Sequence, residues 1–182
     1  MKYFTKELWL GANSRNDSRY RETSDQWNAN FTAYQAQLQT IQHRLDEAAY
    51  RFFIEENLHD GRVLSFTVGD AIHHETHGSA LFDINLHNTT VEIKALSSQR
   101  DVQYTLRYSK LRRVQFDYPS ETPLFHVEGA HIGDWGYDEL TAADDDYLRH
   151  EVLFASGSTI LIEFKDFSYE REPCEGSRYQ SL

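Results

Sequence analysis

A single apolar stripe is the feature that most constrains this chain. Between Ser24 and Asp60, apolar side chains recur at alternating spacings of four and three residues, which is typical of one face of an α-helix. The positions between them are mostly polar. The pattern predicts one continuous helix over residues 24–57, with Ser24 or Asp25 capping its start. The stripe consists of Trp27, Phe31, Tyr34, Leu38, Ile41, Leu45, Ala48 and Phe52.

After Asp60 the hydrophobic period changes to two, which indicates β-strands. The predicted fold class is therefore α+β, with one long amphipathic helix packed on a curved, mostly antiparallel sheet of about seven or eight strands. The apolar stretches that would form the sheet lie at 62–68, 82–86, 91–95, 102–108, 114–118, 124–127, 135–140, 150–154 and 159–165, and residues 167 and 169 could extend the last of them.

The length of 182 residues predicts a single domain spanning residues 1–182. Residues 1–10 could form a short strand or a turn of helix. Residues 11–22 are rich in turn formers and read as a polar loop. Residues 170–182 contain Pro173 and Gly176, so we expect a loosely packed tail there.

The net charge of −11 is placed unevenly along the chain. Residues 121–182 hold 14 of the 29 acidic side chains but only 4 of the 18 basic ones. An acidic surface repels phosphate backbones, so the sequence argues against nucleic-acid binding and favours a basic protein partner. The alternative is that the acidic surface serves only solubility.

Neither a membrane span nor a signal peptide is indicated. No apolar run approaches the roughly 18 residues that a spanning helix needs, and the first residues lack the apolar region of a signal peptide. The single cysteine, Cys174, cannot form a disulfide within the chain, so a reducing compartment is the default expectation. The sequence thus predicts a cytoplasmic protein.

The densest polar cluster lies in the last third and mixes carboxylates with aromatic residues. Trp and Tyr among carboxylates favour a protein-binding patch. An equally good interpretation puts Trp135 and Tyr137 in the core, with solvated acidic neighbours. Nothing fixes the separation that a catalytic carboxylate pair needs, so no catalytic residue is assigned. The candidate binding residues are Trp135, Tyr137, Asp138, Glu139, Asp144, Asp145, Asp146 and Glu151.

Two histidine motifs are candidate metal ligands, and for both a structural role without a metal is the preferred interpretation. His59–Asp60 could ligate a metal, but such sites need further ligands, and a structural corner between the helix and the first strand suits its position better. In the second motif, His74-Glu75-Thr76-His77 is one residue short of the His-Glu-x-x-His zinc motif, and no helix is indicated. His73 and His77 could still chelate a metal from a loop, but a polar loop between strands that is rich in histidine is the preferred interpretation. No cofactor or metal is therefore predicted.

Five short segments together resemble a bacterial family of unknown function. They are Met1–Glu7 (Met-Lys-Tyr-Phe-Thr-Lys-Glu), Leu58–Val63, Trp135–Glu139, His150–Phe154 and Thr159–Phe167. The members of this family are small cytoplasmic proteins with the same order of helix and sheet. They look like the acidic immunity-type proteins found beside bacterial toxins, which is an analogy and implies no activity.

Three functional hypotheses follow. The first is a non-enzymatic protein that offers its acidic, aromatic-bearing face to a basic protein. An immunity protein is one example of this class. The second is a metal-dependent hydrolase that uses His59, Asp60 and carboxylates of the last third. The third is a small-ligand binder in the concave side of a curved sheet.

Overall fold

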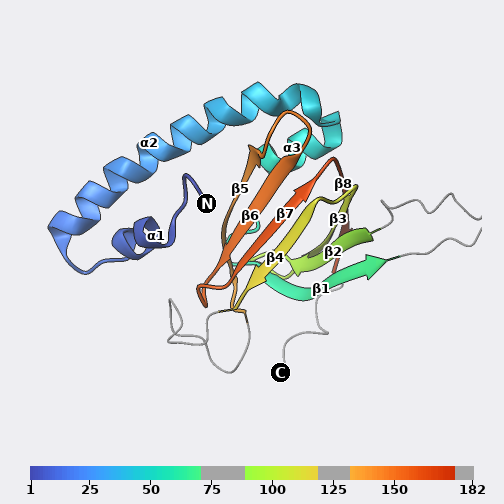
Figure 1. The fold of residues 1–182 in the computed structure, drawn as a ribbon. Coiled ribbons are helices and arrows are strands. Elements are labelled where there is room, and N and C mark those ends of the chain that lie inside the picture. Colours follow the sequence, from blue (N-terminus) through green and yellow to red (C-terminus); the bar gives the residue numbers. More distant parts are fainter. Residues whose placement is uncertain (71–88, 119–131, 175–182) are drawn as a thin grey trace, which may run out of the picture.

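The computed structural model describes residues 1–70, 89–118 and 132–174 and has the predicted α+β class (Figure 1). Helices precede strands along the chain, as the change of hydrophobic period predicts. The elements are α1 (Lys6–Ala12), α2 (Asp17–Ile41), the 3-10 turn η1 (Gln42–Arg44), α3 (Glu47–Glu55), β1 (Arg62–Asp70), β2 (Thr89–Leu96), β3 (Val102–Ser109), β4 (Arg113–Asp117), β5 (Trp135–Ala142), β6 (Leu148–Phe154), β7 (Thr159–Phe164) and β8 (Asp166–Pro173).

The helical stretch starts earlier than predicted and is broken near its end. Asn16 caps α2 by accepting a hydrogen bond from the backbone N–H of Arg19, so most of the predicted 11–22 loop is helical and the prediction was wrong there. The break follows η1, where Leu45 is extended and the Asp46 side chain caps α3 through the N–H of Ala49. The apolar rhythm continues across Asp46, so periodicity alone predicted one helix where the structure has two, with Asp46 capping the second.

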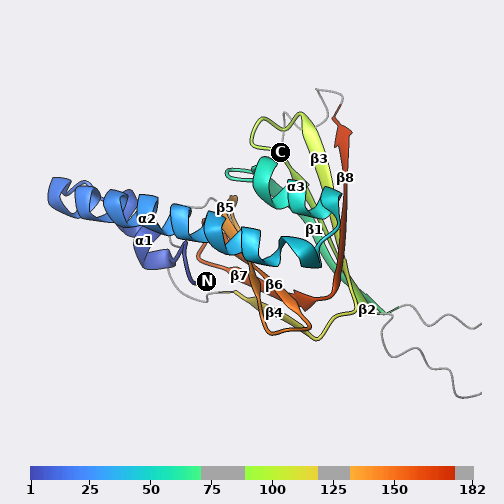
Figure 2. The ribbon, with the colours of Figure 1, turned by 90° about the horizontal axis from the view of Figure 1, so that it is seen from above.

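The break changes which stripe residues are buried. Tyr34, Leu38 and Ile41 are buried in α2, as predicted, whereas Phe31 is 47% exposed. Because α3 begins anew after Asp46, its buried alanine is Ala49 and not Ala48. The C-terminal half of α2 packs on β5 and α3 packs on β8, while the N-terminal half of α2 extends past the sheets with α1 beside it (Figures 1 and 2).

The strands form two four-stranded sheets and not the single curved sheet that was predicted. Sheet A has the order β1-β2-β3-β8 and sheet B the order β4-β7-β6-β5. All pairings between these strands are antiparallel, as expected. The stretches 82–86 and 124–127, and the motif His73–His77, lie outside the described residues.

The chain changes sheets at Lys165, the one residue between β7 and β8. β7 pairs with β4 and β6 in sheet B, whereas β8 pairs with β3 in sheet A. Phe167 and Tyr169 therefore belong to a separate strand and do not extend β7. Residues 170–173, predicted as loose tail, are paired strand, and the rest of that tail from residue 175 lies outside the described part.

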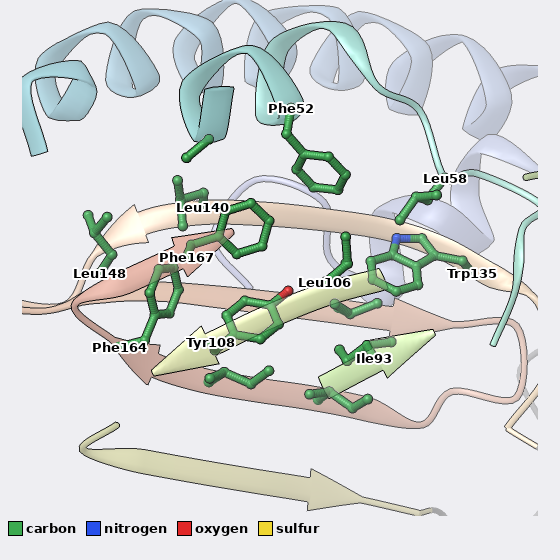
Figure 3. Close-up of a cluster of buried hydrophobic side chains, with 14 of the residues drawn as sticks. Phe52, Leu58, Ile93, Leu106, Tyr108, Trp135, Leu140, Leu148, Phe164 and Phe167 are labelled. Carbon is green, nitrogen blue, oxygen red and sulfur yellow. The ribbon is translucent and has the colours of Figure 1, made fainter. Parts of the chain in front are cut away.

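The core fills the space between the two sheets and under α3 (Figure 3). Phe52 from α3, Tyr108 from sheet A and Trp135 from sheet B point into it. Burial of side chains of this size supplies the main favourable term in folding, at about 25 cal/mol per Å² of apolar surface. Ile93, Leu106, Tyr108, Trp135, Leu140, Phe154, Ile160, Ile162 and Phe164 are all fully buried. Among the described helices, none has the length and apolar character needed to span a membrane.

Candidate functional site

The predicted binding residues divide into a buried pair, Trp135 and Glu139, a half-buried group of Tyr137, Asp138 and Glu151, and the exposed run Asp144–Asp146. Trp135 and Glu139 are both 0% exposed, so neither can touch a partner in this conformation, and their assignment to a docking face is corrected. The register shift between Trp135 and Tyr137 puts the side chains of Trp135 and Glu139 on opposite faces of β5. Trp135 packs in the core beside His150 and Phe154, whereas Glu139 is buried under the N-terminal segment. Of the two interpretations left open for Trp135, the core one is confirmed.

Asp138 lies at the end of a buried chain of hydrogen bonds. Its carboxylate accepts from Trp135 Nε1 at 2.9 Å and lies 3.1 Å from His150 Nε2, and His150 Nδ1 lies 2.7 Å from the Tyr108 hydroxyl. Tyr108 and His150 are 0% exposed. Burial, and then the negative charge of Asp138, raise the pKa of Tyr108 well above its usual value. These groups satisfy one another inside the core.

Glu139 and Glu151 hold the N-terminal segment against sheet B. The Glu139 carboxylate accepts hydrogen bonds from the backbone N–H groups of Lys2, Tyr3 and Phe4. Glu151 Oε1 lies 2.8 Å from the amino group of Met1. Both carboxylates therefore bind a segment of their own chain, which the sequence pattern did not indicate.

The Asp144–Asp146 turn between β5 and β6 is exposed, and much of its charge is neutralised locally. The Asp144 carboxylate pairs with Arg112 and accepts from the backbone N–H groups of Asp146 and Tyr147. Asp146 pairs with Lys165 at 3.6 Å. The guanidinium of Arg112 and the ammonium of Lys165 also lie over the Tyr147 ring. The negative run in the sequence thus forms a mixed-charge surface.

The pairing of Asp144 predicts a pH dependence of stability. The hydrogen bonds from Arg112, Tyr147 and Asp146 lower the pKa of Asp144 from 3.8 to about 2. A carboxyl with a lowered folded-state pKa stabilises the fold above its unfolded pKa, and this stabilisation is lost as the pH falls from about 4 to about 2. We expect Asp144→Asn to lower the melting temperature at pH 7 and to flatten its fall across that window. Asp145→Asn is the matched control, and an equal loss in both variants would contradict the assignment.

His59 and Asp60 lie at the predicted corner between the helical stretch and β1. The side-chain oxygen Oδ1 of Asn57 accepts a hydrogen bond from the backbone N–H of His59. The Asp60 carboxylate lies 3.2 Å from His59 Nδ1, and Asp60 has a positive φ of 61°. Among the described residues, no three His, Cys, Asp or Glu side chains gather in a group that could hold a metal ion.

The Tyr137 ring packs between this corner and the helices α1 and α2. Its ring centroid lies 4.7 Å from that of His59, 5.2 Å from that of Trp9 and 4.5 Å from that of Trp27. The Trp9 ring also packs so closely on Gly136 that a Cβ there would collide with it. Burial, and then the nearby Asp60, raise the pKa of Tyr137. These contacts give Tyr137 and His59 a packing role.

Two hollows in the described part of the chain bear on the hypothesis of a small ligand on the concave side of a sheet. One hollow of about 660 Å³ lies at the bend between α2 and α3 and is open to solvent. Another of about 300 Å³ lies over β2, β3 and β8. The first is lined by Gln39, Gln42, His43, Leu45, Asp46, Glu47 and Tyr50.

Exposed apolar side chains gather where the edges of the two sheets approach each other. The Phe66 and Phe116 ring centroids are 6.1 Å apart, and Phe116 lies 6.2 Å from Tyr118. Leu64 is 39% exposed, Phe116 44%, Tyr118 50% and Val68 51%. We call this surface the apolar seam; it consists of Leu64, Phe66, Val68, Phe116 and Tyr118.

The sequence pattern missed the apolar seam because its two halves lie about fifty residues apart in the chain. One local signal was present, since the run Val63–Gly69 contains no charged residue. The position of Phe116 beside Phe66 depends on how sheet A lies on sheet B, which no local pattern encodes.

Comparisons with known proteins leave the site to be interpreted from its own geometry. No family model, curated protein or solved structure matches this chain.

Proposed function

We propose that the chain is a non-enzymatic protein-binding protein whose docking surface is the apolar seam. The observation that carries the proposal is the packing of Phe116 against Phe66 and Tyr118, which joins the exposed aromatic residues of β4 to the β1 edge. Of the eight large hydrophobic side chains that are exposed in the described residues, four belong to these two segments: Leu64, Val68, Phe116 and Tyr118. Exposed apolar groups that form one patch, with aromatic members, are typical of protein interaction sites. Single scattered ones would need no explanation.

The arrangement of the polar groups favours binding over catalysis. Tyr108, His150 and Asp138 hydrogen-bond to one another within the core, and Glu139 is occupied by backbone N–H groups. A catalytic acid or base must reach its substrate within hydrogen-bond distance. The His59–Asp60 pair is partly open to solvent, and no third His, Cys, Asp or Glu of the described residues joins it in a group that could hold a metal ion.

A second candidate surface is the acidic turn, which would suit a basic partner of the kind that immunity-type proteins bind. In its favour, the Asp146 side chain is 78% exposed and its nearest cation, Lys165, lies at the long distance of 3.6 Å. Asp145 is also exposed. Such a surface would steer a basic protein by charge and would lose affinity as salt shortens the Debye length from about 10 Å at 0.1 M to about 3 Å at 1 M.

The two surfaces can be separated by matched variants of the purified protein. We expect Phe116→Asp to weaken binding of any partner recovered by affinity purification by roughly 30-fold, since a central aromatic residue contributes about 2 kcal/mol or more. Phe31→Asp is the control, because Phe31 is exposed to a similar extent on α2, away from the apolar seam. Affinity is measured by calorimetry at 0.1 M and 1 M salt.

The outcomes are distinct. Loss of binding in Phe116→Asp, with little dependence on salt, supports docking at the apolar seam. Loss in Asp145→Lys/Asp146→Lys, with a strong dependence on salt, supports the acidic turn in its place. A partner that binds both variants and Phe31→Asp as tightly as the parent protein would exclude both surfaces.

A further inference from the structure

Residues 2–4 are held on the molecule by side chains of other elements and not by strand pairing. Their three consecutive backbone N–H groups converge on the carboxylate of Glu139, with distances of 2.7 Å from Tyr3 and 3.4 Å from Phe4. The carbonyl oxygen of Tyr3 accepts a hydrogen bond of 2.7 Å from Asn30 Nδ2 on α2. Within the described part of the chain, no backbone-to-backbone hydrogen bond ties these residues to either sheet.

The segment lies between α2 and β5 (Figure 1), and its two aromatic side chains are anchored there. The Tyr3 ring centroid lies 5.5 Å from that of Tyr34. The Phe4 ring lies 5.2 Å from Trp27 and 5.3 Å from Tyr34 on α2. On the side of β5 it lies 5.9 Å from Tyr137. Aromatic pairs at these distances stabilise beyond the burial of their area, so both rings contribute to holding the segment.

Glu139 requires an occupant that donates hydrogen bonds. Its side chain is 0% exposed, and apart from the amino group of Met1 at 3.9 Å, no cation of the described residues pairs with it. A buried carboxylate without donors is strongly destabilising, because neither water nor a counter-ion takes their place. Any segment that lies on β5 at this point must therefore supply backbone N–H groups to Glu139.

We propose that this surface is a binding site for a short segment of a partner protein, and that residues 2–4 occupy it in competition with that partner. The present occupant defines the chemistry of the partner's segment. It has two consecutive aromatic residues, and it has no proline at these positions, since each residue must donate its N–H. We call the surface the segment site; it consists of Trp27, Asn30, Tyr34, Tyr137 and Glu139.

The charge around the segment site favours a segment that is basic and not acidic. Glu139 and Glu151 lie against the present occupant, and they would repel a carboxylate in its place. In the occupant, the ammonium of Lys2 lies 4.7 Å from the centroid of the Tyr3 ring, so a cation beside the aromatic pair is accommodated. The net charge of −11 attracts basic proteins to the molecule as a whole.

The segment can leave its site without loss of a helix or a strand. Residues 2–4 belong to neither, and α1 begins with its own cap, the side chain of Thr5. Regions without backbone pairing open at a lower free energy than the strands of the core. While the segment is in place it covers Glu139, so a partner binds only by exchange with it. The inference goes beyond docking at the apolar seam, from which it uses no residue.

The test supplies the segment as a separate peptide. The probe is Met-Lys-Tyr-Phe-Thr-Lys, the sequence of residues 1–6, acetylated and amidated at its ends. The control peptide has alanine in place of both aromatic residues. The full chain carries Tyr3→Ala and Phe4→Ala, which removes the two rings from the segment site. We expect the probe, and not the control peptide, to raise the melting temperature of this variant, because a ligand stabilises the fold that binds it.

Calorimetry then compares the affinity of the probe for matched full-length proteins. In the parent protein the chain's own segment competes at an effective concentration in the millimolar range, so the probe should bind about tenfold more weakly than to the Tyr3→Ala/Phe4→Ala variant. Adding Glu139→Gln to that variant should weaken binding by about tenfold or more, because it removes the charge and one acceptor oxygen. Adding Phe116→Asp should not, since β4 and β5 are opposite edges of sheet B.

Equal affinity of the probe for the parent protein and the variant would place its binding elsewhere and overturn the proposal. Absence of binding to a variant that circular dichroism shows to be folded would overturn it as well. If the double variant does not fold, Phe4→Ala alone provides the same comparison with the same two outcomes. The proposed function is decided separately, by the effect of Phe116→Asp on a partner protein.

Discussion

Replacing Glu139 with Ala is expected to lower the free energy of unfolding by about 3–5 kcal/mol, because it removes a buried charged acceptor and leaves the donors it served unsatisfied. These donors are the backbone N–H groups of Lys2, Tyr3 and Phe4, and Glu139 itself is 0% exposed. Urea denaturation measures the loss. Hydrogen exchange at Tyr3 and Phe4 should accelerate more than exchange in β2 and β3, since the N-terminal segment loses its anchor first.

Two variants provide the comparison for Glu139. Glu139→Gln keeps one acceptor oxygen and the side-chain volume, so it should lose less stability than the alanine variant. Glu55→Gln removes an exposed carboxylate from α3, where it pairs with Arg51 on the surface, and should be close to neutral. A neutral Glu139→Ala variant would mean that the N-terminal segment is not fixed by this carboxylate.

Replacing Trp135 alone with Ala should lower the free energy of unfolding by about 3–5 kcal/mol, which is usual for a fully buried aromatic residue. The ring contacts Phe154 and His150, and its Nε1 donates to Asp138. Phe116→Ala, which truncates an aromatic residue that is 44% exposed, is the control and should change stability little. Chemical denaturation decides between them, and a loss below 1 kcal/mol for Trp135→Ala would place this side chain outside the core.

The local patterns of the sequence predicted the elements well and their assembly poorly. The stripe residues Tyr34, Leu38, Ile41 and Phe52 are buried as expected, because a helix fixes which residues share a face. The break at Asp46 was missed, since a capping side chain lay within the apolar rhythm. The division into two sheets was missed as well, because a change of sheet needs only the single residue Lys165.

Among the candidate site residues, the sequence predicted exposure correctly only where the charge of the side chains themselves keeps them in solvent. Asp144–Asp146 are exposed, as a run of carboxylates should be. Alternation placed Trp135 and Glu139 on a strand, but it could not say that a Glu would be turned inward to bind backbone N–H groups. The positions of Arg112 and Lys165 beside the acidic turn depend on the order of strands in sheet B, which residue types near the turn do not reveal.

The order of strands in sheet A has a consequence for the nascent chain on the ribosome. β1, β2 and β3 are synthesised in succession and can pair as they emerge, but the second partner of β3 is β8, at residues 166–173. The edge of β3 therefore stays open while the more than fifty residues between β3 and β8 are added, among them the strands of sheet B. Non-local pairings of this kind slow folding and expose strand edges to other chains. Translation must deliver nearly all of the described chain before the β8 end of sheet A is complete, so β3 depends on the last strand for its second partner.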